Sequence, residues 1–446
     1  MLTEKRSKAA LSIVSTTLLA AMVGCSSDGG AGQDGSSANP QAGNTSSNGK
    51  VELRIAWWGS QDRHDRTLKA IELYEQQNPN VKLTAEFIAW DGYWDKLATQ
   101  AAGKNLPDII QQDYKYVNEY VARDLLVDLN PYVQSNTIDL RDADHLHTDG
   151  GKINNKLYAV NLGTNSLAIA YDPAMFAQAG VPELKPGYTW DDLAAAARQL
   201  KSKLGSDAYG MPNFNSMDPF KHLLREKGLW LYNEQANGLG YDNDQILVDY
   251  FKYFDALLKD GVVPTPQVTQ DIKGLEDELI VHKKSPMHFF NSNQVVALQK
   301  AANRPLKLTI LPDLPGGTKG HFLKPSQFFS ITKHSKHPEE AAKFINFFTN
   351  DLKANEILGA ERGVPISSKV REHLGKSMGD AAKEMFGYIE LAQQHAREIH
   401  PPDPEGSSKI EALFARIQEA VNYGELTPEQ AAKQFREEGT KELQKK

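Results

Sequence analysis

Three loops of this chain place aromatic rings beside charged and amide side chains, and each loop follows a predicted β-strand. They lie at 57–64, 90–94 and 112–114. Tryptophan and tyrosine stack on the apolar faces of sugar rings, while charged side chains form strong hydrogen bonds with hydroxyl groups. A saccharide needs both kinds of contact, so the loops predict a sugar-binding site. The contact residues expected in these loops are Trp58, Gln61, Asp62, Arg63, His64, Trp90, Trp94, Asp113 and Tyr114.

Some aromatic and acidic residues also have a structural interpretation. Trp57 and Trp230 suit a packed core as well as a ligand cleft, and Trp190, in the first turn of a predicted helix, favours a structural role. Asp62 and Asp65 would also stabilise the start of the first helix through its dipole. These alternatives stay open at the level of the sequence.

Alternating strands and helices must position the loops. Residues 51–55 alternate apolar and polar, a helical apolar face spans 68–74, and alternation returns over 81–87. This order predicts parallel strands joined by a right-handed crossover. A helix around 93–102 and a short strand at 108–110 continue the pattern. In open α/β sheets the loops at the carboxyl ends of the strands line the ligand crevice, so we expect the aromatic loops to converge there.

The rest of the chain repeats this alternation with interruptions and becomes mainly helical towards its end. The body is therefore predicted to be α/β. Further strands are expected at 167–171 and 328–331, and further helices after Thr189, over 246–258, after Pro338 and after Thr427.

The sequence argues against several classes of function. Motifs typical of serine hydrolases, zinc proteases, P-loop proteins and dinucleotide-binding proteins are absent. The pair His145 and His147 is a weak metal candidate, and the glycines at 316–320 predict a turn. A formal net charge of −7 without a basic run argues against nucleic-acid binding. No catalytic residue, cofactor or metal is expected.

The amino terminus predicts export and lipid attachment. Three basic residues precede an apolar run at 9–23 that is too short to span a bilayer, and the run leads to Cys25, the only cysteine. This pattern resembles a bacterial lipoprotein signal peptide at 1–24, with Cys25 carrying the acyl chains, palmitate among them. Residues 25–50 are then the lipidated cysteine and a flexible linker with a reach of roughly 25–30 Å. The protein is expected on the extracellular face of the cell membrane.

A series of ordered motifs resembles family 1 extracellular solute-binding proteins of carbohydrate ABC transporters. The resemblance runs from about residue 51 to the end of the chain. Its motifs lie at 57–64, 93–98, 107–113, 151–158, 272–277, 292–294, 341–348 and 361–365.

The resemblance implies a two-lobed periplasmic-binding-protein-like fold, also called a Venus flytrap, in which hinge segments join the lobes. The length of the chain also suggests two domains. The N-terminal lobe is expected to comprise 51–165 plus 323–362, and the C-terminal lobe 166–322 plus 363–446. The hinge crossings are expected near 162–167, 319–325 and 361–365, where Gly163, Gly320 and Gly363 suit a changing backbone.

The resemblance further implies a monomer that binds an oligosaccharide between its lobes and delivers it to the permease subunits of an ABC importer. It would be a binding protein and not an enzyme. Further contact candidates are Thr164, Asn165, Trp230, Asn291, Asn293 and Arg362.

Within the family, the motifs at 57–64, 272–277, 361–365 and 401–407 are most similar to the branch that binds pectin-derived oligosaccharides, including rhamnogalacturonan fragments. Related binders take chito- or xylo-oligosaccharides, and a surface-anchored glycoside hydrolase or a structural adhesin are alternatives of other classes. Cations available to a uronate are Arg63, Lys115, Lys221, Arg225, Lys324 and Arg362.

Overall fold

The computed structural model describes residues 50–214, 216–404 and 406–445, and a five-stranded sheet organises the first part of the chain. The order is β2-β1-β3-β12-β6. β1 pairs in parallel with β2 and β3, whereas β12 runs antiparallel to β3 and β6. The strands are β1 (Val51–Trp58), β2 (Val81–Ile88), β3 (Ile109–Gln112), β6 (Val160–Asn161) and β12 (Phe328–Ile331). The predicted parallel β-α-β unit is confirmed.

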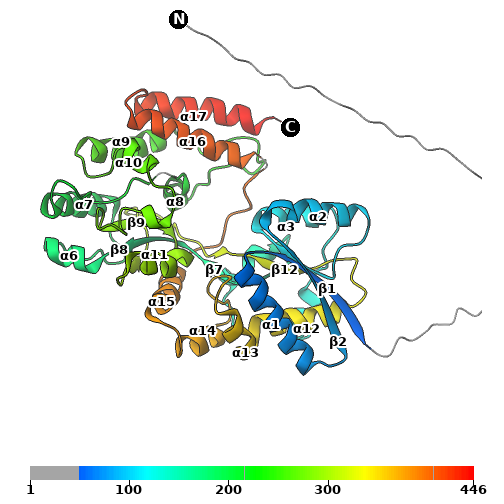
Figure 1. Cartoon of the computed structure of the whole chain (residues 1–446). Helices are drawn as coiled ribbons and strands as arrows, with labels where there is room; N and C mark the ends of the chain where they lie inside the picture. The colour runs from blue at the N-terminus through cyan, green and yellow to red at the C-terminus, as the bar shows by residue number, and fades with distance from the viewer. Residues whose placement is uncertain (1–49, 215, 405, 446) are drawn as a thin grey trace, which may run out of the picture. The chain divides into compact units, whose positions relative to one another are not determined.

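The alternation of side chains along β1 divides two cores. Leu53, Ile55 and Trp57 pack on one face of the sheet, against helices α1 (Gln61–Gln77), α12 (Pro338–Asn350) and α13 (Leu352–Leu358). Ala56 and Trp58 pack on the other face, against α2 (Trp90–Ala102) and α3 (Tyr114–Ala122). Figure 1 shows α2 and α3 on one side of β1 and α1 and α12 on the other. Neighbouring residues of a strand point to opposite faces, so the adjacent tryptophans lie in different cores.

A second, antiparallel sheet organises the next part of the chain. Its order is β10-β8-β9, and β8 is the strand predicted at 167–171. The strands are β8 (Leu167–Tyr171), β9 (Met287–Asn291) and β10 (Lys307–Thr309). The neighbouring elements are α6 (Pro173–Ala179), α7 (Trp190–Leu204), α8 (Asp218–Glu226), α9 (Gln245–Lys259), α10 (Pro266–Gln270), the 3-10 turns η2 (Leu275–Asp277) and η3 (Ser292–Gln294), and α11 (Val295–Ala302).

Helices dominate the end of the chain, as predicted. α7 begins after Thr189 and α17 after Thr427, and both threonines form the expected capping box. These late helices are α14 (Ser368–Gly375), α15 (Asp380–Gln394), α16 (Ser407–Asn422) and α17 (Pro428–Leu443), and the short elements earlier in the chain are α4 (Asn130–Gln134), α5 (His145–Thr148), η1 (Asp149–Gly151), β4 (Lys152–Ile153) and β5 (Lys156–Leu157).

Three segments predicted as hinge crossings lie side by side between the two sheets. β7 (Thr164–Asn165) pairs with β11 (Lys324–Pro325), and Thr164 exchanges backbone hydrogen bonds of 2.8 and 3.1 Å with Val364. Gly363 adopts a φ of 97°, which favours glycine, and a Cβ on Gly163 would lie 2.1 Å from the carbonyl oxygen of Arg362. The close approach of these backbones therefore requires both glycines. The lobe boundaries given above stay a prediction.

Candidate ligand-binding site

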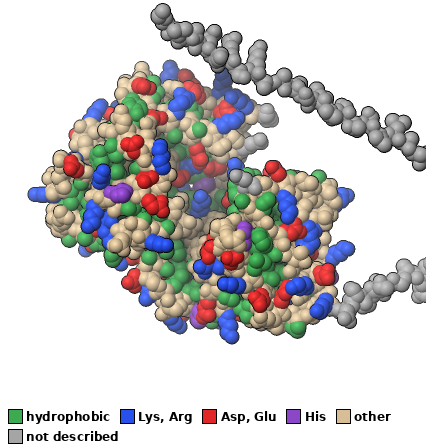
Figure 2. Space-filling view, in the orientation of Figure 1, with side chains coloured by type: hydrophobic (Ala, Val, Ile, Leu, Met, Phe, Trp, Pro, Cys, Tyr) green, Lys and Arg blue, Asp and Glu red, His purple; other side chains and the backbone are tan. Residues whose placement is uncertain are grey.

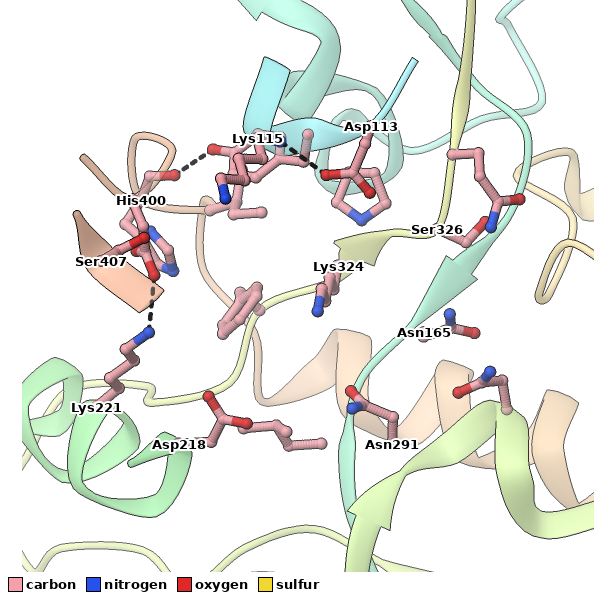
Figure 3. Close-up of a pocket in the computed structure, with 18 of the residues that line it drawn as sticks. Asp113, Lys115, Asn165, Asp218, Lys221, Asn291, Lys324, Ser326, His400 and Ser407 are labelled. Carbon is pink, nitrogen blue, oxygen red and sulfur yellow. Dashed lines mark hydrogen bonds and ion pairs between the residues drawn. The ribbon is translucent and has the colours of Figure 1, made fainter. Parts of the chain in front are cut away.

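A cavity of about 600 Å³ lies where β7, β11 and the start of α3 meet elements of the second sheet and the late helices. Figure 2 shows the molecule hollowed there, and Figure 3 shows side chains from these elements surrounding the space. Its volume is in the range of small-molecule sites. The lining comprises Asp113, Tyr114, Lys115, Asn165, Leu167, Asp218, Lys221, Asn291, Asn293, Gln294, Phe322, Lys324, Pro325, Ser326, Gln327, Ile399, His400, Asp403, Ser407, Ser408 and Glu411.

The end of β3 delivers three consecutive side chains to the cavity. Asp113 caps α3 by accepting a 2.9 Å hydrogen bond from the backbone N–H of Lys115. Burial raises the pKa of the Asp113 carboxyl, although the ammonium groups of Lys324 and Lys115 act to lower it. The hydroxyl of Tyr114 donates to the carbonyl of His400, which ties α3 to the segment before α16. The Asp113 cap and the Tyr114 hydrogen bond together hold the start of α3 in place at the edge of the cavity.

Amide side chains supply neutral hydrogen-bonding groups. Asn165, Asn291, Asn293 and Gln327 line the cavity. Among the described residues, the side-chain oxygens of Asn165 and Gln327 are buried and have no hydrogen-bond partner. A buried acceptor without a donor is costly, so a hydroxyl that reached either oxygen would satisfy it.

Three lysines line the cavity, and they differ in whether a carboxylate of the protein pairs with them. The ammonium of Lys221 is 2.8 Å from Asp403 and 3.3 Å from Glu411. Burial acts to lower the pKa of Lys221, but these carboxylates outweigh it and the pKa is raised. Within the described parts of the chain, neither Lys115 nor Lys324 forms a salt bridge. Figure 3 shows Lys324 extending into the cavity. These two cations are available to an anionic ligand.

An aromatic stack closes one side of the cavity. The ring of Trp230 stacks on His400 at 3.4 Å and 20°, and Phe322 makes an edge contact with the same imidazole at a centroid distance of 5.2 Å. Burial lowers the pKa of His400 to about 3, so the imidazole is neutral at physiological pH. Phe322 and His400 therefore present apolar ring surface to a ligand.

The sequence-predicted residues fall into three groups: those that line the cavity, two that lie next to the lining, and those that contact other protein groups. Asp113, Tyr114, Asn165, Asn291 and Asn293 line the cavity. Two further predicted residues stand directly behind this lining. They are Trp230, which supports His400, and Thr164, whose buried hydroxyl lies 2.8 Å from the ring of His147.

The predicted cations of the 57–64 and 361–365 motifs bind protein groups instead of lining the cavity. Arg63 donates from Nε to both carboxylate oxygens of Glu361 at 2.9 Å. Arg362 is only 5% exposed, and it hydrogen-bonds Gln111 at 3.2 Å and Thr67 at 2.9 Å. Burial lowers the pKa of Arg362 to about 9, which leaves it charged at neutral pH. Both guanidinium groups connect α1 to the crossing segment near 361.

The polar residues at the start of α1 likewise have partners within the protein. Asp62 pairs with Arg66 at 2.8 Å, and Gln61 donates to Asp65 at 2.7 Å. His64 is buried and accepts from the indole N–H of Trp57 at 3.1 Å. Asp62 lies in the first turn of α1, as the structural alternative expects, whereas Asp65 lies beyond that turn.

The predicted tryptophans form an aromatic cluster beside the sheet. Trp58 is 7% exposed and lies 5.0 Å from Trp90 and 5.5 Å from Trp94, measured between ring centroids. Trp90 is 43% exposed, whereas Trp58 belongs to the core with Tyr93. None of the three lines the cavity. Helix α2 covers the face of β1 to which Trp58 points, which accounts for the burial of this side chain.

Several lining residues were not predicted from the sequence. Asp218, Phe322, Ser326 and His400 lie in segments for which the sequence predicted neither a strand-end loop nor an aromatic cluster. The one available signal was the unusual proline-rich segment at 401–407, which contains Asp403 and ends at Ser407. These residues reach the cavity only through contacts between segments that are distant in the sequence.

Comparison with known proteins decides the family. The profile of bacterial extracellular solute-binding proteins matches residues 69–385. The chain belongs to this family. Its fold is the two-lobed solute-binding protein fold, which confirms the predicted fold class.

Solved structures support the assignment over most of the chain. A family 1 extracellular solute-binding protein from Alicyclobacillus acidocaldarius is 34% identical with a TM-score of 0.82, and the match covers 89% of this chain and 100% of that one. An oligogalacturonide-binding protein from Yersinia enterocolitica is 26% identical with a TM-score of 0.74, over 88% and 99% of the two chains. A de novo designed cysteine esterase also matches, at 26% identity and a TM-score of 0.78, over 89% and 99%.

Every helix among the described residues is too short or too polar to span a lipid bilayer. No group of three or more histidine, cysteine, aspartate or glutamate side chains in the same part of the chain is arranged to hold a metal ion. The single cysteine, Cys25, and the predicted signal peptide and linker lie outside the described residues.

Proposed function

We propose that this solute-binding protein captures a uronate-containing oligosaccharide in the cavity and delivers it to the permease subunits of a carbohydrate ABC importer. The observation that carries the proposal is the pair Lys115 and Lys324, which line the cavity without a salt bridge to any described residue. An unpaired cation in a partly enclosed site favours an anionic ligand, because a carboxylate forms charge-assisted hydrogen bonds with it.

The remaining groups of the cavity suit the hydroxyls and faces of sugar rings. The amides of Asn165 and Gln327 offer unpartnered acceptors, and Phe322 and His400 offer apolar surface. The Yersinia relative is an oligogalacturonide-binding protein, and galacturonate is a uronate. This relative supports the pectin branch over binders of the neutral chito- and xylo-oligosaccharides.

Calorimetry with the full-length chain tests the ligand class. Uronate-bearing oligosaccharides are expected to bind with micromolar or tighter affinity, about −8 kcal/mol or better. Neutral oligosaccharides of the same length, including chito- and xylo-oligosaccharides, are expected to bind at least about tenfold more weakly, because they lack a partner for the two ammonium groups. Equal or tighter binding of a neutral panel member would show that the lysines do not select the ligand.

Binding without turnover is part of the proposal. Asp113, Asp218, Asp403 and Glu411 line the cavity, and a glycoside hydrolase needs two suitably placed carboxylates. Asp403 and Glu411 are, however, both engaged by the ammonium of Lys221. Prolonged incubation with the best-bound oligosaccharide is expected to leave it intact in product analysis. Cleavage in proportion to protein concentration would favour the hydrolase.

We also propose that lipid on Cys25 anchors the protein as a monomer at the extracellular face of the membrane. Two acyl chains anchor stably where one does not. The Cys25→Ser variant, expressed in a bacterium, is therefore expected to appear unprocessed or in the medium, as measured by fractionation and mass spectrometry of the amino terminus. A Ser26→Ala variant serves as the control and should stay with the membrane. A Cys25→Ser protein that is processed and membrane-bound like the parent would contradict lipid attachment at this residue.

A further inference from the structure

A second cavity, of about 390 Å³, adjoins the first. The two share the lining residues Leu167, Asp218, Asn291 and Gln294, so a ligand chain that passes these side chains enters both. The rest of the second cavity is formed by β9, by residues on both sides of η2, by the region of α10 and by the segment before α8.

The two cavities differ in the cations that line them. Lys115, Lys221 and Lys324 line the first alongside its carboxylates, whereas no lysine or arginine among the described residues lines the second. The second instead contains Asp218 and Glu278, and the carboxylate of Glu278 is 3.3 Å from the imidazole of His288. A uronate placed in the second cavity would meet like charge without a lysine or arginine to offset it.

Neutral polar and aromatic groups complete the second cavity. Asn213 is 7% exposed, and its side-chain oxygen has no hydrogen-bond partner among the described residues. Phe289 lies beside it in the lining and packs against Phe214 at a centroid distance of 4.9 Å. An unpartnered amide acceptor, carboxylates and an aromatic face are suited to the hydroxyls and apolar face of an uncharged sugar ring.

We infer that the second cavity binds neutral sugar units, so that the preferred ligand is a mixed oligosaccharide with its uronate in the first cavity and neutral residues in the second. This inference rests on the proposed function, because it assumes that the first cavity holds a uronate. It narrows the ligand from any acidic oligosaccharide to one in which charge is confined to one end.

Matched oligosaccharides test the inference by calorimetry on the full-length chain. Chains of two, three and four units that carry one terminal uronate on neutral sugars are compared with all-uronate chains of equal length. The mixed chain is expected to bind at least about tenfold more tightly at the lengths that reach the second cavity, because it places no uronate beside Glu278. All-uronate chains that bind equally or more tightly at every length would overturn the inference.

The Glu278→Gln variant assigns the preference to this cavity. It keeps the shape of the side chain but removes the charge, so the preference for mixed over all-uronate chains is expected to fall by about fivefold to tenfold. Glu276→Gln, at an exposed position two residues earlier that lines neither cavity, is the control and should leave the preference unchanged. An unchanged preference in Glu278→Gln would also overturn the assignment.

The same experiment separates failure of the inference from failure of the proposed function. If uronate chains bind and Lys324→Ala weakens them, but mixed and all-uronate chains bind alike, only the second cavity has been misassigned. If no uronate-bearing chain binds, or if Lys324→Ala has no effect, the proposed function fails and the inference fails with it.

Discussion

The Lys115→Ala/Lys324→Ala double variant should bind uronate-bearing oligosaccharides about a hundredfold more weakly than the parent, and each single variant about tenfold more weakly. A hydrogen bond to a charged group contributes roughly 1.5–3 kcal/mol, and each 1.4 kcal/mol is about tenfold in affinity. Affinity for neutral oligosaccharides should change by less than about threefold, because a neutral ligand has no carboxylate that pairs with either lysine. Calorimetry with matched uronate and neutral chains measures both effects.

The control for the lysines is Lys319→Ala. Lys319 is exposed on the segment that leads to β11, and it does not line the cavity, so its removal changes net charge without changing the site. Salt provides a second readout. Added sodium chloride should weaken uronate binding in the parent more than in the double variant. Salt screens the attraction between the two ammonium groups and the uronate, and only the parent has that attraction. Equal affinity of parent and double variant for uronate chains would contradict the role of both lysines.

Replacement of Arg362 should lower the stability of the protein and leave the ligand affinity of the folded protein nearly unchanged. Arg362→Ala is expected to lower the free energy of unfolding by about 3–5 kcal/mol, because it opens a cavity and removes buried charged hydrogen bonds. The partners that lose a donor are Gln111 and Thr67, and the guanidinium also lies 5.3 Å from the ring centroid of Phe348. Denaturant unfolding measures the loss.

Two further variants sharpen the interpretation of Arg362. Arg362→Met fills much of the space without a buried charge, so it should cost clearly less than Arg362→Ala. Arg141→Ala is the surface control, since Arg141 is largely exposed and pairs locally with Asp139. A variant of Arg362 with an unchanged midpoint and a tenfold or greater loss of affinity would show that the guanidinium contacts ligand, as the sequence first indicated.

The contrast between Arg362 and Lys324 shows why motif position alone misleads at this site. Arg63 and Arg362 both lie in motifs that resemble those of sugar binders, but Glu361, which is 298 residues from Arg63 in sequence, neutralises the first. Lys324 lies in no such motif, and only the pairing of β11 with β7 brings it to the cavity. Which cation keeps its charge free is a property of long-range contacts.

Local patterns determined the elements of this protein. The alternation along β1 and β2, the capping boxes at Thr189 and Thr427 and the apolar stripe of α12 all act over a few residues, so they are legible in the sequence. The strand-end rule also placed Asp113 and Tyr114 at the cavity, because a strand that ends at Gln112 must release its next residues at the edge of the sheet.

Tertiary structure alone decided which side chains of those elements face the cavity. Trp57 and Trp58 both follow the predicted strand pattern and could have faced a ligand. Helices cover both faces of the five-stranded sheet, so both tryptophans are buried. Phe322 and His400 reach the cavity through segments that have no local signal. A side chain binds a ligand only where no protein group already covers or neutralises it, and that condition depends on residues hundreds of positions away.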